Sequence, residues 1–133
     1  MLTLADVRDY IAMLNIAVDD NVYCGKLDAK KDKSIGVYNL KQNRSPITAI
    51  GGNGYSSYNT KGISLLVHWN KSPRDTERTA QLLYDALLTC RNVDINDNKI
   101  LFAQHYHNEP ISVDTDEKGI YEYVVECLFY YER

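Results

Sequence analysis

The sequence is poor in several features that mark particular protein classes. Only 2 of its 133 residues are Phe and 1 is Trp, and its 3 cysteines form no C-x-x-C motif. This odd number of widely spaced cysteines favours neither a zinc finger, a thioredoxin-like motif nor a disulfide framework. We expect Cys24, Cys90 and Cys127 to be buried free thiols in a reducing compartment. No apolar run approaches the ~18 residues that span a bilayer, and no basic leader begins the chain, so neither a membrane nor a secretory protein is predicted.

A strong excess of one charge is also missing. The chain carries 15 Lys and Arg against 18 Asp and Glu, a net charge of -3, which argues against a dedicated nucleic-acid-binding domain. The charge is nevertheless uneven, because residues 24–62 sum to +5 and residues 94–133 to -6. Such asymmetry indicates either contact with nucleic acid or complementary faces that bring copies of one protein together.

Tyrosine is the aromatic residue that is abundant, with 11 copies. So many amphipathic rings predict a half-exposed sheet or an interface. In the last predicted strand, residues 120–132, alternation places Tyr121, Tyr123 and Tyr131 on the core face and Tyr130 on the opposite face. Tyr55 and Tyr58 fall in a predicted loop, so burial within one subunit is not expected for them.

Hydrophobic periodicity predicts one α+β domain over residues 1–133. Thr3 and Asp6 resemble a capping box that begins a helix with an apolar stripe reaching Val18. A second helix begins at Ser72, buries a stripe ending at Cys90, and stops near Asn92. Strands are expected at 22–27, 34–40, 63–70, 99–106 and 120–132, with a short one at 47–50. The order α-β-β-(β)-β-α-β-β predicts a mostly antiparallel sheet with two helices packed on one face.

Three connecting segments are predicted to lack regular structure. Residues 28–33 suit a hairpin loop, and residues 110–119 a polar loop. Residues 41–62 contain Pro46 and 4 of the 7 glycines, and they predict a long, flexible loop that contacts partners. Its glycines lack the Lys-Ser/Thr ending of a phosphate-binding loop.

Few residues suggest catalysis. His105, His107 and Glu109 alternate along a predicted strand, and two histidines with a carboxylate are typical of a catalytic metal site with open positions. Polar residues at a strand end, with Pro110 following, favour a structural role instead. No G-x-S-x-G or H-E-x-x-H motif occurs, and no cofactor site is predicted. A small metal-dependent enzyme using His105 and His107 therefore stands as an alternative to a non-enzymatic protein.

Two longer segments carry a resemblance to a known family. They are GISLLVHWNKSPRDTE at 62–77 and PISVDTDEKGIYEYVVE at 110–126. Both resemble the minor capsid proteins found in prophages of Gram-positive bacteria, a group that is itself similar to the tail terminator, or tail completion, proteins of long-tailed phages. The likeness runs through most of the chain, from residues 20–23 to residues 130–133.

The resemblance implies a non-enzymatic phage structural and assembly protein without cofactors. Such α+β subunits form a ring, commonly a hexamer, that caps the tail tube and offers a docking surface to the head connector. A head-tail joining role on the head side remains open. The implied partners are further copies of the chain, the tube protein and the connector proteins, with DNA only as passing cargo and no membrane. The implied location is the virion, and the bacterial cytoplasm during assembly.

A candidate assembly interface follows from the charge count and the tyrosines. The basic segment of one subunit is expected to meet the acidic last strand of the next and so close a ring. The expected contact residues are Lys41, Arg44, Tyr55, Tyr58, Lys61, Glu122, Glu126 and Tyr130. A nucleic-acid adaptor that uses the basic 26–44 segment is the remaining alternative.

Overall fold

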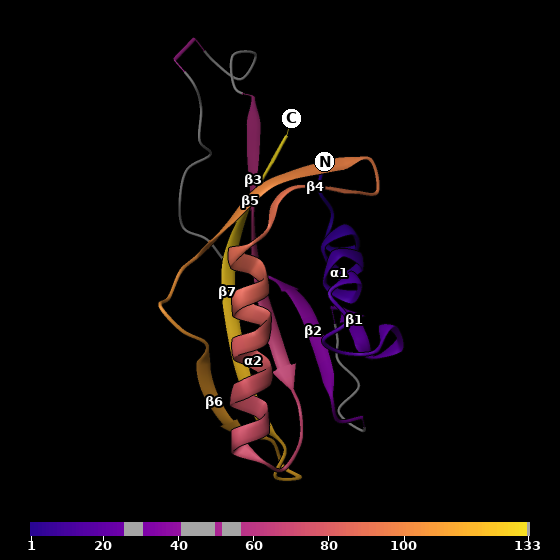
Figure 1. Ribbon diagram of the computed structural model, residues 1–133, viewed down its shortest axis with the longest axis vertical. Coiled ribbons are helices and arrows are strands. Elements are labelled where there is room, and N and C mark those ends of the chain that lie inside the picture. The colour runs from indigo at the N-terminus through magenta and orange to yellow at the C-terminus, as the bar shows by residue number, and fades with distance from the viewer. Residues whose placement is uncertain (26–30, 41–49, 52–56, 133) are drawn as a thin grey trace.

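A computed structural model describes residues 1–25, 31–40, 50–51 and 57–132. These residues form two helices and seven strands (Figure 1). The helices are α1 (Leu4–Met13) and α2 (Pro73–Leu88). The strands are β1 (Val22–Cys24), β2 (Ser34–Asn39), β3 (Tyr58–His68), β4 (Arg91–Ile95), β5 (Asn98–His105), β6 (Ile111–Thr115) and β7 (Tyr121–Glu132). A short 3-10 helix, Asp19–Asn21, precedes β1.

All seven strands belong to one sheet: six follow the order β1-β2-β3-β7-β5-β4, and β6 pairs with β7 off this path. Every pair is antiparallel except β1 and β2, which run parallel. The long β7 lies at the centre, because β3 pairs with it along its whole length, from Tyr58 opposite Glu132 to His68 opposite Glu122. On its other edge β7 pairs first with β6 and then with β5.

Both helices pack on the same face of the sheet and enclose the core. Tyr10 of α1 meets Phe129 of β7 edge to face, with ring centroids 6.3 Å apart. The fully or almost fully buried residues alternate along the central strands and recur every three or four residues on α2: Ile63, Leu65, Val67, Val125, Cys127, Phe129, Thr76, Ala80, Leu83 and Leu87. Within the described ranges no helix covers the opposite face, which we call the outer sheet face.

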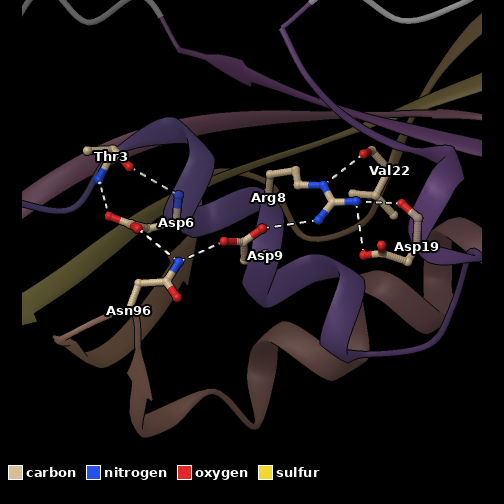
Figure 2. A network of polar contacts seen from close by, with 7 residues as sticks. All are labelled: Thr3, Asp6, Arg8, Asp9, Asp19, Val22 and Asn96. Carbon is tan, nitrogen blue, oxygen red and sulfur yellow. Dashed lines mark hydrogen bonds and ion pairs between the residues drawn. The ribbon is translucent and has the colours of Figure 1, made fainter.

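A polar network fixes the start of α1 to the hairpin formed by β4 and β5 (Figure 2). The Thr3 hydroxyl accepts from the Asp6 N–H, and the Asp6 carboxylate accepts from the Thr3 N–H, so the predicted capping box is present. The side-chain amide of Asn96, at the hairpin turn, donates to Asp6 at 3.1 Å and to Asp9 at 2.7 Å. The amide of Asn98 also donates to Asp6.

Arg8 fastens the other side of α1 to the segment that precedes β1 (Figure 2). Its guanidinium donates to the carbonyl of Val22 at 2.9 Å. The same group pairs with Asp9 at 3.1 Å and with Asp19 at 2.9 Å. A short helix is thereby held against both edges of the sheet by side chains from distant parts of the sequence.

The predicted α+β class and element order are confirmed. So is the second helix, with Ser72 as its N-cap and Pro73 at its start, and its predicted stripe is buried: Thr76, Ala80, Leu83, Leu87 and Cys90. The helix ends at Leu88, however, before Asn92. Strand β3 is central, as expected from the apolar residues on both of its faces, but it begins at Tyr58 within the predicted loop.

Other predicted boundaries are wrong for identifiable reasons. Helix α1 ends at Met13, because Asn15 takes a positive φ of 57°; Val18 therefore lies outside the helix and is exposed. Strands β1 and β2 pair in parallel rather than as a hairpin. Cys24 is exposed, although Cys90 and Cys127 are buried as expected.

Two strands, β4 and β6, form where no strand was predicted. Asn96 and Asp97 both adopt positive φ, at 46° and 66°, which suits the two central residues of a tight hairpin turn and lets β4 pair with β5. Strand β6 forms in the predicted polar loop because the first half of β7 extends past β5 and offers it an edge. Of the strand predicted at 47–50, residues 47–49 lie outside the described residues, as does most of the predicted loop.

Candidate assembly surface

Three aromatic rings from three neighbouring strands gather on the outer sheet face. Tyr130 of β7 stacks on Phe102 of β5, with ring centroids 4.3 Å apart and planes 13° apart. On its other side Tyr130 contacts Tyr58 of β3, with centroids 5.7 Å apart. The Tyr130 hydroxyl donates to the side chain of Gln104 at 3.1 Å. We call Tyr58, Phe102 and Tyr130 the aromatic cluster; Phe102 is 42% exposed, although it is apolar.

The other half of the outer sheet face is acidic. Oε2 of Glu122 lies 3.0 Å from Nδ1 of His68, and the His68 side chain is only 1% exposed. Asp116, in the turn before β7, lies 3.8 Å from Nε2 of the same ring. Further along β7, Glu126 lies 3.0 Å from Nε2 of His107. Among the residues that the structure describes, each of these glutamates pairs through one carboxylate oxygen.

The turn that carries Asp116 is held by that carboxylate. Burial opposes its ionisation, but the N–H groups of Ile120 and Lys118 donate to it and His68 lies near. Together these contacts hold the pKa of Asp116 below its ordinary value. The acidic end of the outer sheet face is therefore a fixed arrangement of carboxylates around His68.

The structure brings together some of the predicted interface residues. Tyr58, Tyr130, Glu122 and Glu126 all lie on the outer sheet face. Lys61 points to the opposite face, since it pairs with the inward-facing Phe129. Lys41, Arg44 and Tyr55 lie outside the described residues, so the predicted contact of the basic segment with β7 stays a prediction.

Phe102 and Gln104 were missed by the sequence analysis. The pairing of β5 with β7 shifts between Ile100 and Phe102. A shift of one residue changes which side chains face the core. Strict alternation along the strand would place Phe102 on the core face together with the buried Ile100. Its exposure follows only from the shift in pairing between β5 and β7, which the sequence does not show.

The predicted metal ligands do not converge. Strand β5 ends at His105, whose ring stacks on Tyr84 of α2 at 3.7 Å on the helix side of the sheet. Burial there lowers the pKa of His105, although its hydrogen bond to the Tyr84 carbonyl opposes this effect. His107 instead pairs with Glu126 on the outer sheet face. Among the residues that the structure describes, no three His, Cys, Asp or Glu side chains could hold a metal ion.

The fold and the aromatic side chains of the outer sheet face define a class of protein. A two-layer α+β fold with partly exposed aromatic side chains on the sheet face opposite its described helices is typical of a subunit that binds other proteins. Neither described helix is long and apolar enough to cross a bilayer.

Comparison with known proteins identifies the family. The family model described as bacteriophage tail terminator protein matches residues 10–133, and the chain belongs to this family. Searches of curated proteins and of solved structures gave no match. The predicted similarity to tail terminators is thereby confirmed. The protein is a structural and assembly component of a phage virion, and its partners are other tail and head proteins.

Proposed function

We propose that this protein terminates the phage tail by forming a homo-oligomeric ring on the end of the tail tube. The ring then provides the surface on which the head connector docks. The family match over residues 10–133 is the observation that carries this proposal. The partly exposed aromatic residues of the outer sheet face support it, Phe102 among them, because exposed apolar side chains that gather on one face are expected to be buried in a larger assembly.

The two-sided construction of the subunit suits a ring. A closed ring of identical subunits needs two different patches that fit one another, since each subunit contacts one neighbour through each patch. Here the helices lie on one side of the sheet and the outer sheet face on the other (Figure 1). Carboxylates that face the ring's lumen would let DNA pass without binding, because like charges repel.

Sedimentation of the purified protein tests this proposal. It is measured alone, at low ionic strength and high protein concentration, and again with purified tail tubes of the parent phage. We expect a species of several times the subunit mass of 15.2 kDa, free or bound to tubes. Assembly that occurs only with tubes also supports the proposal. A protein that stays monomeric and unbound under both conditions contradicts it.

A second measurement separates the tail side from the head side. The protein is mixed with tail tubes in one sample and with DNA-filled, tailless heads in another. A tail terminator binds the tubes in the absence of heads. Binding to heads alone would instead assign the chain to head-tail joining from the head side.

A further inference from the structure

Strand β6 is an edge of the sheet that the rest of the described chain leaves open. It pairs with β7 on one side, and no other described helix or strand makes an extensive contact with it. All five of its residues are exposed, the apolar Ile111 and Val113 by 38% and 45%. Because successive backbone groups of a strand point to alternate sides, part of the N–H and C=O groups of β6 face away from β7. Such unpaired groups are a template for a further strand.

The strands at the two ends of the sheet order, β1 and β4, are both engaged by α1. The carbonyl of Val22, in β1, accepts from the Arg8 guanidinium at 2.9 Å. At the other end, Asn96 and Asn98 bond the hairpin of β4 and β5 to α1, and α1 packs on both β1 and β4. Among the described edge strands, β6 is therefore the one that no helix engages in this way.

The surroundings of β6 are acidic. Residues 109–126, which contain β6, the turn after it and the part of β7 beside it, hold one basic residue, Lys118. Their carboxylates are Glu109, Asp114, Asp116, Glu117, Glu122 and Glu126. The first two and Glu117 are exposed and have no ion-pair partner among the described residues. Helix α2, which the Tyr123–Glu77 bond places beside β7, does not offset this charge, because its basic residues are outnumbered by its acidic ones. A strand added to β6 therefore meets a negative edge.

The form of this edge restricts what can pair with it. Natural sheets protect an open edge with a charge or a bulge, and β6 has both. Its pairing with β7 shifts between Ser112 and Asp114, and Asp114 takes a positive φ of 74°. The negative charge opposes pairing with β6 of a second copy, because like charges then meet, whereas it favours a strand that carries Lys or Arg. The edge therefore selects a basic partner over its own copy.

We propose that β6 accepts an extended, basic segment of the tail tube protein as an additional strand. Main-chain hydrogen bonds to Ile111–Thr115 supply affinity, and Lys or Arg side chains of the segment pair with Glu109, Asp114 and Glu117. The inference rests on the proposed function, which places the end of the tube against this protein, and it names the surface used. It does not depend on how neighbouring subunits of the ring contact one another.

Synthetic peptides test the edge itself. Fluorescence anisotropy at low ionic strength compares the peptide Lys-Val-Lys-Val-Lys-Val with one that has Glu in place of Lys and with one whose two central amides are N-methylated. We expect the first to bind at least about tenfold more tightly than the others, because one has the wrong charge and the other is blocked on both edges. Slower amide hydrogen exchange at residues 111–115 locates the binding at β6. If the first peptide binds no better than the others, or leaves exchange at 111–115 unchanged, the inference is overturned.

A double variant tests the same surface against purified tail tubes. Asp114→Asn with Glu117→Gln removes two exposed charges, and Asn accepts the positive φ at position 114. We expect the folded variant, checked by circular dichroism, to bind tubes about tenfold more weakly, with the largest loss at low ionic strength. The matched control is Asp94→Asn with Asp97→Asn, which removes an exposed carboxylate of β4 and another at positive φ. It is expected to bind tubes as the wild type does.

The outcomes separate this inference from the proposed function. If the wild type and the double variant bind tubes equally well, the inference is overturned and the proposed function stands. If the double variant instead loses self-association in the absence of tubes, the added strand comes from a second copy and the assignment to the tube is wrong. Weakened binding to DNA-filled heads alone overturns that assignment as well. A wild type that stays monomeric and binds no tubes overturns both proposals.

Discussion

At the scale of single residues, Asp6 shows how one side chain connects local and distant structure. It completes the capping box with Thr3, and it accepts hydrogen bonds from Asn96 and Asn98. Burial disfavours the charged carboxylate, but these hydrogen bonds outweigh that effect and lower the pKa of Asp6. The box was predictable from two residues close in sequence. The bonds to the hairpin were not, because they depend on where the sheet places a turn far along the chain.

We predict that Asp6→Ala destabilises the fold in a pH-dependent way. Loss of a cap residue costs about 1 kcal/mol, and the bonds to the hairpin add to this. Because the folded pKa lies below the unfolded value of 3.8, the stabilisation is present above that pH and is lost as the pH falls through the folded pKa. Urea unfolding is expected to show a clear difference from wild type at pH 7 and a smaller one near pH 3.

A control separates this effect from a general change in charge. Asp20→Ala removes an exposed carboxylate for which the structure shows no bond among the described residues, and it is expected to change the free energy of unfolding by less than about 0.5 kcal/mol. Equal unfolding of Asp6→Ala and wild type at pH 7 would show that the network in Figure 2 contributes nothing to stability.

A second prediction at this scale concerns Tyr130. Tyr130→Phe keeps the ring between Phe102 and Tyr58 and loses only the bond to Gln104, so we expect assembly close to that of wild type. Tyr130→Ala removes the central ring and is expected to weaken association by about tenfold or more, as loss of an interface aromatic commonly does. Sedimentation equilibrium measures both. Equal association of Tyr130→Ala and wild type would place the aromatic cluster outside the interface.

At the scale of elements, the sequence predicted those that depend on signals from residues close in the chain and missed those that depend on pairing with distant strands. Helix α2 was predicted well because Ser72, Pro73 and its apolar stripe are local signals. Strands β4 and β6 were missed because their residues are mostly exposed and become strands only by pairing with β5 and β7. The parallel pairing of β1 with β2 was missed for the same reason, since register and direction depend on the completed sheet.

Adjacent leucines on α2 give a prediction at this scale. Leu83 is fully buried against the sheet, whereas Leu82, its neighbour in sequence, is 56% exposed. Leu83→Ala is expected to lower the free energy of unfolding by about 2–5 kcal/mol, because it leaves a cavity in the core. Leu82→Ala is expected to change it by less than about 0.5 kcal/mol.

Denaturant unfolding checks this pair. Equal free energies of unfolding for Leu83→Ala and Leu82→Ala would contradict the placement of Leu83 in the core and of Leu82 at the surface.

At the scale of the whole molecule, the described helices lie on one side of the sheet and the aromatic cluster and acidic residues on the other, so the subunit has two different surfaces, as head-to-tail association requires. The predicted fold class, with both helices on one face of the sheet, already implied that the two sides of the subunit differ. Four of the predicted contact residues lie together on the outer sheet face: Tyr58, Glu122, Glu126 and Tyr130.

Electron microscopy of tail tubes mixed with the purified protein tests the central claim most directly. The account predicts a ring at one end of each tube when the wild-type protein is added. Tube ends that stay bare with the wild-type protein at saturating concentration would contradict the account.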